Sequence, residues 1–468
     1  MTAELQVDVC IIGGGPAGAV LARRLAMLGH AVAVVERSMH GARVRGEVMP
    51  AAGWPVLDQL GITREVLDTG ARPVHRSLAL WGEETLAIRE HDVPQLAVQR
   101  PQLDAMLLGL ARRAGATVLQ PAVAAGGRRE RDGWLIAVEH GDHVIDVRAR
   151  LLGDASGRAA WQRAGRDQLG PRTIAMRGLW RGRILPAESR LEAMDDGWLW
   201  GSPVGADRYA VMAVVDADTP VGIGRYLTSL GGSQLFRELD SIAQLREDLD
   251  YGEATCYAAR AACERGILRV GDASYSLDPL SSAGLHTALG SALHAAAALH
   301  TLLLHPDREP LVQRFYEETR RSEIARHRAA AARLYGECAW RSHAFWDRRT
   351  SVQLLPRTAP ATDDAIALDP ATTRVTLSAG VALEEMPCVT GDVIEARLGV
   401  TSGSRDRPFV WIAGVAIAPL VAPLVTRPMT PVELLATWRH VPPGRHRELL
   451  DWLLRERIVQ PVAPRERV

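Results

Sequence analysis

The chain has 468 residues, of which 47% are hydrophobic and 24% are charged, and its formal net charge is zero. A chain of this length can bury a large core, so we expect two or three domains. Its neutrality, with no basic stripe, argues against nucleic acid as a partner.

Five cysteines are scattered along the chain without the paired spacing of a zinc or dithiol site. We therefore expect inert thiols, no metal site and a reducing, cytoplasmic location. The first residues lack the charged and apolar segments of a signal peptide. Histidines or prolines interrupt the longest apolar runs, 283–304 and 410–425, so no membrane span is predicted. The chain contains no lysine, because all 55 residues counted as lysine or arginine are arginine.

Residues 8–37 have the pattern of a dinucleotide-binding unit. An apolar run, 9–12, predicts a buried strand. Three glycines follow in the spacing G-x-G-x-x-G: Gly13, Gly15 and Gly18. A helix that stops near Gly29 and a second strand, 31–35, lead to an acid, Glu36. Such glycines let the backbone approach a pyrophosphate at the helix N-terminus, and the carboxylate suits the ribose diol of FAD or NAD rather than NADP.

The remaining elements are predicted in chain order. The first half contains a loop with Arg43, Arg45 and Glu47, a helix ending near Leu60, strands within 72–99, a helix over 100–114, a strand over 118–124 and an antiparallel pair within 126–152. The second half contains a mostly antiparallel sheet over 170–260, a strand at 267–270, helices from about 283 and over 309–340, a linker, and a tail with strands and two helices. The first tail helix has a capping-box pattern: Thr430, Pro431 and Glu433.

Three motifs stand in the order and spacing of one family. They are GGGPAG at 13–18, GDASGR at 153–158, and RVGDA followed by DPLSSAGLH over 269–286. Over about residues 6–340 the chain resembles FAD-dependent monooxygenases of the para-hydroxybenzoate hydroxylase type. GEVMP at 46–50 and WLWGSP at 198–203 resemble signatures of the halogenase-like branch, with Ser202 in place of an isoleucine. In GDASGR, the residues SG replace the spacing usual in the family, which leaves the roles of Asp154 and Gly157 open.

The resemblance implies an α/β fold with a Rossmann-like FAD-binding domain, an inserted antiparallel-sheet substrate domain and a small C-terminal α+β domain, for which a winged-helix-like module is one form. The expected ranges are 1–75, 98–165 and 255–345 for the FAD-binding domain, 76–97 and 166–254 for the substrate-side sheet, 346–373 for the linker and 374–468 for the C-terminal domain.

The resemblance also implies the cofactor and its binding residues. FAD would be held non-covalently, with NADH or NADPH as reductant and O₂ as co-substrate. The expected binding residues are Gly13, Gly15, Pro16, Ala17, Gly18, Glu36, Arg37, Arg45, Arg100, Asp272, Pro279, Gly284 and Leu285. Among them, Asp272 would bind the ribityl chain. The helix after the loop 279–284 would direct its positive end at flavin N1 and O2, where charge accumulates on reduction.

No Ser/His/Asp or metal constellation is present, so the chemistry is expected to reside on the cofactor. The candidate catalytic residues are His286, Arg45 and Glu47. His286 would be a donor near the isoalloxazine, and Arg45 and Glu47 would line the mouth of the flavin or substrate site. The structural alternative for His286 is a histidine whose hydrogen bonds are satisfied at the start of a helix. For Arg45 and Glu47 it is a charged, solvated surface loop.

In function, the resemblance implies hydroxylation of an aromatic ring by a flavin C4a-hydroperoxide. Halogenases of this branch use a lysine, and a chain without lysine cannot halogenate by that route. The branch also includes flavoproteins that hydroxylate a tryptophan of a partner polypeptide during quinone cofactor maturation, and the long C-terminal extension resembles theirs. The implied partner is the small subunit of quinohaemoprotein amine dehydrogenase, and the implied product leads to cysteine tryptophylquinone. The alternatives are a hydroxylase of a free aromatic metabolite, a reductase of the geranylgeranyl type, and a non-catalytic maturation scaffold.

Overall fold

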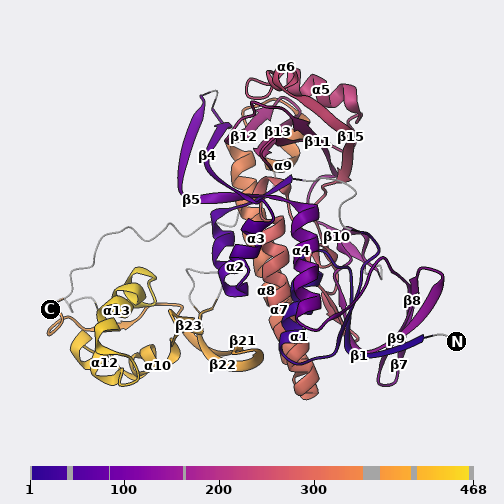
Figure 1. The fold of residues 1–468 in the computed structure, drawn as a ribbon. Helices are drawn as coiled ribbons and strands as arrows, with labels where there is room; N and C mark the ends of the chain where they lie inside the picture. Colours follow the sequence, from indigo (N-terminus) through magenta and orange to yellow (C-terminus); the bar gives the residue numbers. More distant parts are fainter. Residues whose placement is uncertain are drawn as a thin grey trace. The chain divides into compact units, whose positions relative to one another are not determined.

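The computed structural model describes residues 3–39, 46–83, 85–161, 165–350, 369–401 and 408–462. The chain divides into two compact units. The first comprises Met1–Pro306 and Glu323–Leu354, and the second comprises Asp307–Ser322 and Leu355–Val468. Figure 1 labels many of the helices and strands of both units.

The first sheet of the first unit is built around parallel strands. Its main path runs β17-β18-β9-β1-β2-β6. These strands are β1 (Ala3–Ile12), β2 (Val32–Val35), β6 (Thr117–Leu119), β9 (His143–Asp154), β17 (Cys263–Glu264) and β18 (Ile267–Arg269). β1 pairs in parallel with β2 and β9, and β9 pairs in parallel with β18. An antiparallel pair, β7 (Val123–Glu130) and β8 (Gly133–His140), extends the sheet from β9, so the predicted α/β class is confirmed.

The strand predicted over 118–124 is divided in the structure. β6 ends at Leu119 and β7 begins at Val123, with Pro121 between them. Proline has no N–H to donate to a ladder, which explains the interruption. The loop predicted to carry Glu47 is also wrong at that residue, because Glu47 lies in the strand β3 (Gly46–Met49), where Glu47 pairs with Val98. The other helices and strands predicted in this half are present with ends shifted by a few residues, including α2 (Trp54–Leu60), which is followed by α3 (Thr63–Asp68).

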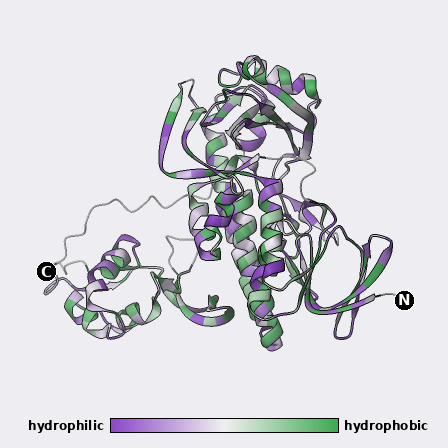
Figure 2. Ribbon diagram, viewed as in Figure 1, coloured by the Kyte–Doolittle hydropathy of each residue, from purple (hydrophilic) through white to green (hydrophobic). Residues whose placement is uncertain are grey.

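Three helices pack together beside this sheet. α1 (Pro16–Met27) contacts both α4 (Arg100–Arg113) and α7 (Gly284–Leu304). Among the described residues, α7 alone is long and apolar enough to cross a membrane, and 67% of that stretch is buried inside the protein. Its hydrophobic colouring in Figure 2 therefore fits a helix that packs within the first unit.

The second sheet of the first unit is almost entirely antiparallel. Its order is β15-β11-β14-β13-β12-β4-β5-β3, and β12 with β4 is a parallel pair. The strands are β3 (Gly46–Met49), β4 (Arg72–Leu80), β5 (Ala87–Gln99), β11 (Thr173–Arg181), β12 (Ser189–Met194), β13 (Gly197–Pro203), β14 (Arg208–Asp216) and β15 (Gln244–Glu253). α5 (Ile223–Gly231) and α6 (Leu239–Ile242) pack here through a core that includes Trp180, Tyr226 and Leu239. A smaller sheet follows the order β10 (Arg166–Gln168), β16 (Tyr257–Ala259), β19 (Tyr275–Ser276).

The predicted linker begins too early. Residues 346–350 belong to α9 (Ala344–Thr350), and Phe345 and Trp346 are completely buried. These rings pack edge-on against each other and against Tyr335 of α8 (Glu309–Glu337). Burial of this much aromatic surface holds a one- to two-turn helix that would be marginal alone. Residues 351–368 lie outside the described residues.

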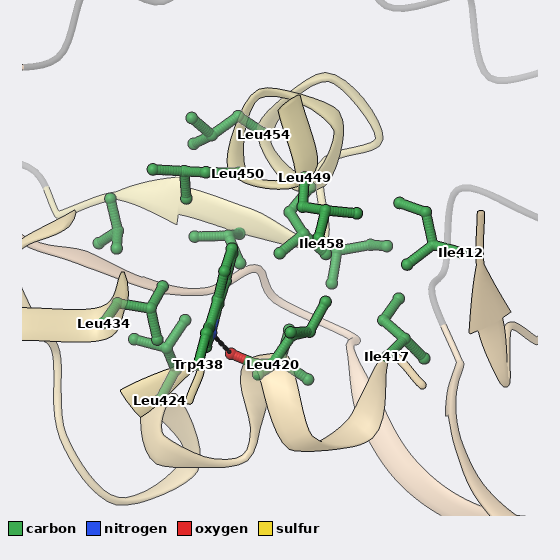
Figure 3. Close-up of a cluster of buried hydrophobic side chains, with 14 of the residues drawn as sticks. Ile412, Ile417, Leu420, Leu424, Leu434, Trp438, Leu449, Leu450, Leu454 and Ile458 are labelled. Atoms are coloured by element: carbon green, nitrogen blue, oxygen red, sulfur yellow. Dashed lines mark hydrogen bonds between the residues drawn. The ribbon is translucent and has the colours of Figure 1, made fainter. Parts of the chain in front are cut away.

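The second unit has a core of its own (Figure 3), with Trp438 buried among leucines and isoleucines. Its strand pairs are β20 (Val375–Leu377) with β25 (Val459–Pro461), β21 (Ala382–Thr390) with β22 (Val393–Thr401), and β23 (Trp411–Ile412) with β24 (Val415–Ala416). Its helical segments are the first part of α8, up to Ser322, together with α10 (Ala418–Val421), α11 (Pro423–Thr426), α12 (Pro431–Thr437) and α13 (His446–Arg455). The predicted capping box is confirmed, since Thr430 and Glu433 exchange hydrogen bonds with each other's backbone N–H.

Candidate active site

A cleft of about 530 Å³ opens at the carboxyl ends of the parallel strands β1, β2 and β9. This is the edge where open α/β sheets bind ligands. Most of the residues predicted to bind the cofactor line it together: Gly13, Gly15, Pro16, Ala17, Glu36, Arg37, Arg100, Asp272, Gly284 and Leu285. Predicted Arg45, like Arg43, lies outside the described residues.

The three motif glycines have different local roles. Gly13 has φ +103°, and a Cβ there would lie 2.3 Å from the carbonyl oxygen of Ala155. A Cβ on Gly18 would lie 1.9 Å from the carbonyl oxygen of Gly13, so this glycine allows α1 to pack on the turn rather than lining the cleft. Gly15 is the N-cap of α1 and has no atom within 4 Å of its Cβ position, which faces open space in the cleft. The turn is therefore tightly packed on the protein side, at Gly13 and Gly18, and open on the cleft side, at Gly15, as pyrophosphate binding requires.

Glu36 presents a fixed carboxylate at the end of β2. The residue is only 8% exposed, and its two carboxylate oxygens accept hydrogen bonds from Gly14 N at 2.6 Å and Ser38 N at 2.8 Å. Each oxygen still has a lone pair, so the carboxylate retains the capacity to accept from a ribose diol. The residues present fit the adenosine end of FAD.

The middle motif shapes the wall of the cleft. Asp154 is buried at the end of β9, and its carboxylate accepts from the backbone N–H and the hydroxyl of Ser156. Ser156 and Gly157 line the cleft, whereas Asp154 does not. Asp154 therefore holds the turn that follows it, and we infer a structural role for this carboxylate.

A cavity of about 480 Å³ lies next to the cleft. Glu47, Arg100, Asp272 and Gly284 line both spaces, so they mark the junction between cleft and cavity. The opposite wall comes from the antiparallel sheet and includes Arg177, Leu179, Trp200, Met212 and Leu249. Predicted Pro279 lines the cavity rather than the cleft. The volume is within the range of small-molecule sites, about 300–1,000 Å³.

Charged groups are paired at the junction. Arg100 donates from Nη1 to Glu47 at 2.7 Å and makes two hydrogen bonds of 3.1 Å with Asp104. Burial would lower the pKa of Arg100, but the two carboxylates outweigh burial and raise this pKa. Asp272 faces the cleft, where desolvation raises the pKa of its carboxyl despite the nearby Arg158. Its backbone carbonyl accepts from the hydroxyl of Tyr257 at 2.5 Å.

The start of α7 lies at the same junction. Ala283 is the N-cap and makes no side-chain capping hydrogen bond, and Gly284 lines both spaces. The first N–H groups of this helix therefore have no side-chain partner from the cap and direct partial positive charge at the junction. A Cβ on Gly284 would approach Glu47 Oε1 to 3.3 Å, which shows how closely this carboxylate approaches the helix start.

His286, a predicted candidate, lines neither the cleft nor the cavity. It is half-buried, and desolvation lowers the pKa of its imidazole, with smaller effects from Glu323 and Arg326 of α8. Its position outside both spaces fits the structural alternative for this histidine. No group of three or more His, Cys, Asp or Glu side chains suited to a metal occurs within the described residues.

The sequence analysis did not single out Asp278 and Arg158, which line the cavity, or Tyr335, which is hydrogen-bonded to Asp278 behind it. Asp278 accepts from Tyr335 Oη at 3.0 Å and from Leu280 N at 3.0 Å. Arg158 donates to the carbonyl oxygen of Thr255 at 2.7 Å and to Ser276, and its guanidinium lies 5.0 Å from the Tyr257 ring centre. DPLSSAG is part of a family motif, but the sequence does not show that its Asp278 is hydrogen-bonded to Tyr335 of α8.

Comparison with known proteins identifies the family of the chain. The family model described as "FAD binding domain" matches residues 6–174, and the model described as "Tryptophan halogenase" matches residues 94–364, more than half of the chain. The chain belongs to the tryptophan halogenase family. It is an FAD-dependent flavoenzyme of the monooxygenase and halogenase group.

The individual relatives and solved structures that the chain resembles are distant in sequence. A tryptophan 2-halogenase of Chondromyces crocatus is 27% identical over 377 residues, which cover 73% of this chain and 70% of that protein. The peptidyl tryptophan dihydroxylase QhpG, described as essential for tryptophylquinone cofactor biogenesis, has a similar fold, with a TM-score of 0.77 and 24% identity over 96% of this chain and 99% of that one. The flavin-dependent halogenase CmlS has a TM-score of 0.79 and 20% identity, covering 99% of this chain and 98% of its own.

Proposed function

We propose that this flavoenzyme is a monooxygenase that hydroxylates a tryptophan side chain in a partner polypeptide during quinone cofactor biogenesis. The observation that carries the proposal is the complete absence of lysine from a chain of the tryptophan halogenase family. The halogenation expected from the family resemblance needs a lysine amine to carry the activated halogen. Arginine cannot replace it, because its guanidinium stays protonated and is a poor nucleophile.

The fold likeness is compatible with this proposal but does not by itself separate it from halogenation, since the halogenase CmlS covers 99% of this chain. QhpG is a peptidyl tryptophan dihydroxylase, and the likeness extends over 96% of this chain, so it includes the C-terminal region as well as the flavoprotein region. The partner we propose is the one the resemblance implies, the small subunit of quinohaemoprotein amine dehydrogenase.

We assign the predicted residues to parts of FAD. Gly13, Gly15, Pro16, Ala17 and Gly18 would form and support the pyrophosphate cradle, Glu36 and Arg37 would hold the adenosine end, Asp272 would bind the ribityl chain, and Arg100, Pro279, Gly284 and Leu285 would surround the isoalloxazine. When bound, FAD supplies hydride acceptance from NADH or NADPH and activation of O₂. The start of α7 would stabilise the negative charge of the reduced cofactor.

The cavity would position the ring. Trp200, Leu179 and Met212 offer apolar contacts for an indole, and the residues shared with the cleft bring the ring to the cofactor. Holding two reactants in this way replaces a bimolecular encounter by an oriented one, which is a large part of catalysis in such enzymes. Indole is electron-rich, so its hydroxylation needs no prior ionisation of the substrate.

The test is a competition between oxygen and halide. Purified protein is supplied with FAD, a reductant, O₂, bromide and either the small subunit or free tryptophan, and products are identified by mass spectrometry. We expect one or two oxygen atoms on a tryptophan of the small subunit, no bromine, and no product from free tryptophan. A brominated product would refute the argument from lysine, and oxygenation of free tryptophan alone would favour a small-molecule hydroxylase. A Gly15→Val variant, whose side chain would enter the cradle, is the matched control and should give no product.

A further inference from the structure

We propose that Asp278 is the base that receives the ring proton during hydroxylation, with Tyr335 as its positioning residue. This inference rests on the proposed function, because it concerns the same reaction in the same cavity. When oxygen adds to an aromatic carbon, that carbon must lose its hydrogen as a proton, and a positioned base accelerates the loss.

Asp278 stands at the right place in the fold. It lies between β19 and the 3₁₀ turn Pro279–Ser281, in the segment that connects Asp272 with Gly284. Those two residues line both the cleft and the cavity, and Asp278 lines the cavity. A ring that enters the cavity toward the cofactor therefore passes the loop that carries this carboxyl.

The carboxyl group is held by neutral donors. Oδ1 accepts from Leu280 N and from Tyr335 Oη, both at 3.0 Å, while Oδ2 lies 3.2 Å from Tyr335 Oη and accepts from Cys256 Sγ at 4.0 Å. A thiol is a weak donor and Oδ1 already has two partners, so the capacity to accept a proton remains on Oδ2. Two other carboxylates of the cavity are ion-paired, Glu47 with Arg100 at 2.7 Å and Asp250 with Arg177 at 3.5 Å. Asp278 has no ion pair of this kind among the described residues.

Tyr335 is fixed by its surroundings. Its hydroxyl accepts from Trp198 Nε1 at 3.2 Å, and its ring packs edge-on against Phe345 and Trp346. Burial raises the pKa of Tyr335 well above the ordinary value, so the phenol stays protonated and donates to Asp278. The chain of hydrogen bonds from Trp198 through Tyr335 thus orients the carboxyl.

The electrostatics make Asp278 a stronger base than an exposed aspartate. Desolvation raises the pKa of its carboxyl, while Leu280 N–H, Arg349 and Tyr335 oppose this effect. The groups that face it from neighbouring elements are Tyr335 of α8, Arg349 of α9 and the thiol of Cys256. Burial raises the pKa of Cys256 to about 12, so the thiol remains protonated and does not compete for the proton.

The step balances in atoms and electrons. The ring gives an electron pair to one oxygen atom derived from O₂, so a C–O bond forms while the O–O bond breaks, and the second oxygen keeps the electron pair of that bond and leaves as water. The C–H bond at the same carbon then breaks, its electron pair restores the aromatic ring, and the proton moves to Asp278 and afterwards to solvent. Over one cycle, O₂, NAD(P)H and one proton convert the ring C–H to C–OH, with NAD(P)⁺ and water as the other products.

The experiment uses the full-length holoenzyme with the partner polypeptide, carrying tryptophan with either hydrogen or deuterium on the ring. In Asp278→Asn, which is isosteric, we expect hydroxylation to slow by about 100-fold or more. C–H cleavage should then limit the rate, giving a primary deuterium isotope effect that the wild type lacks. NAD(P)H consumption without hydroxylated product should rise. The matched control Asp167→Asn removes an exposed carboxylate of β10 that lines neither space and should behave as wild type.

Tyr335→Phe provides a second reading if Asp278→Asn does not fold. The tyrosine hydrogen bond lowers the pKa of Asp278, so its loss should raise this pKa and move the acid limb of the pH–rate profile to higher pH. Two results would overturn the inference while leaving the proposed function intact. One is an Asp278→Asn variant that hydroxylates at the wild-type rate and shows no isotope effect. The other is an acid limb of the pH–rate profile that does not move in Tyr335→Phe. A wild-type enzyme that forms no hydroxylated product would instead overturn the proposed function.

Discussion

Replacing Gly15 with alanine should separate cofactor binding from folding. The residue has φ −68° and ψ −175°, an extended conformation that alanine adopts freely, and a methyl group there meets no protein atom within 4 Å. Substitution of glycine at a compatible position typically stabilises a protein by about 0.4–1 kcal/mol. The protein without FAD should therefore be at least as stable as the wild type.

The same methyl group would occupy the front of the cradle in the cleft. It would push the pyrophosphate away from the N–H groups at the start of α1 and cost one charge-assisted hydrogen bond. Such a bond contributes about 1.5–3 kcal/mol. This corresponds to a dissociation constant for FAD that is about 10- to 150-fold larger.

The assay is a titration of FAD followed by flavin fluorescence, combined with thermal unfolding of the FAD-free protein. Gly290→Ala is the matched control, because Gly290 also has free space around its Cβ position but lies in α7 and lines neither the cleft nor the cavity. It should keep wild-type affinity. Wild-type affinity in Gly15→Ala would refute the assignment of the cradle, and unfolding of its FAD-free form would refute the local geometry.

Three further predictions concern stability. Thr430→Ala removes the capping box of α12 and should lower the free energy of unfolding of the second unit by about 1 kcal/mol, measured by hydrogen exchange; unchanged exchange of its amides would contradict the cap. Trp438→Ala empties the centre of the core in Figure 3 and removes the donor to Leu420 O, so the second unit should lose about 3–5 kcal/mol in denaturant unfolding, and a loss below about 1 kcal/mol would disagree with its burial. Desolvation raises the pKa of Asp278 in the folded state, so this carboxyl contributes least to the free energy of unfolding at high pH. As the pH rises from the ordinary pKa of aspartate through the raised one, the wild type should lose stability relative to Asp278→Asn. A difference in the free energy of unfolding that stays constant with pH would contradict this sign.

Local sequence determined much of the cleft. The order of strand, glycine turn, helix and acid fixes where Gly13, Gly15 and Glu36 lie, because each contact is made within one β-α-β unit or with the adjacent strand. Arg100 and Asp272 were reached through motif resemblance, and the fold brings them to the same cleft although 172 positions separate them in the numbering of the chain.

Other features depend on tertiary packing that no local pattern carries. α9 is short, and three of its seven residues are charged, which is typical of a linker; only its burial against Tyr335 explains its helix. The partnership of Asp278 with Tyr335 joins residues 57 positions apart on different elements. His286 was a candidate because it lies at the start of the helix near the cofactor, but it lines neither the cleft nor the cavity, and the charges that act on it are those of Glu323 and Arg326 on α8.

Isotopic labelling would show whether the protein transfers an oxygen atom from O₂ to a tryptophan of a partner polypeptide. The holoenzyme would be supplied with NADH or NADPH, the partner polypeptide and ¹⁸O₂ in ordinary water, and the modified peptide analysed by mass spectrometry. The account predicts that each new tryptophan oxygen carries the ¹⁸O label. Incorporation of unlabelled oxygen, or oxidation of the reductant with the tryptophan unmodified, would contradict it.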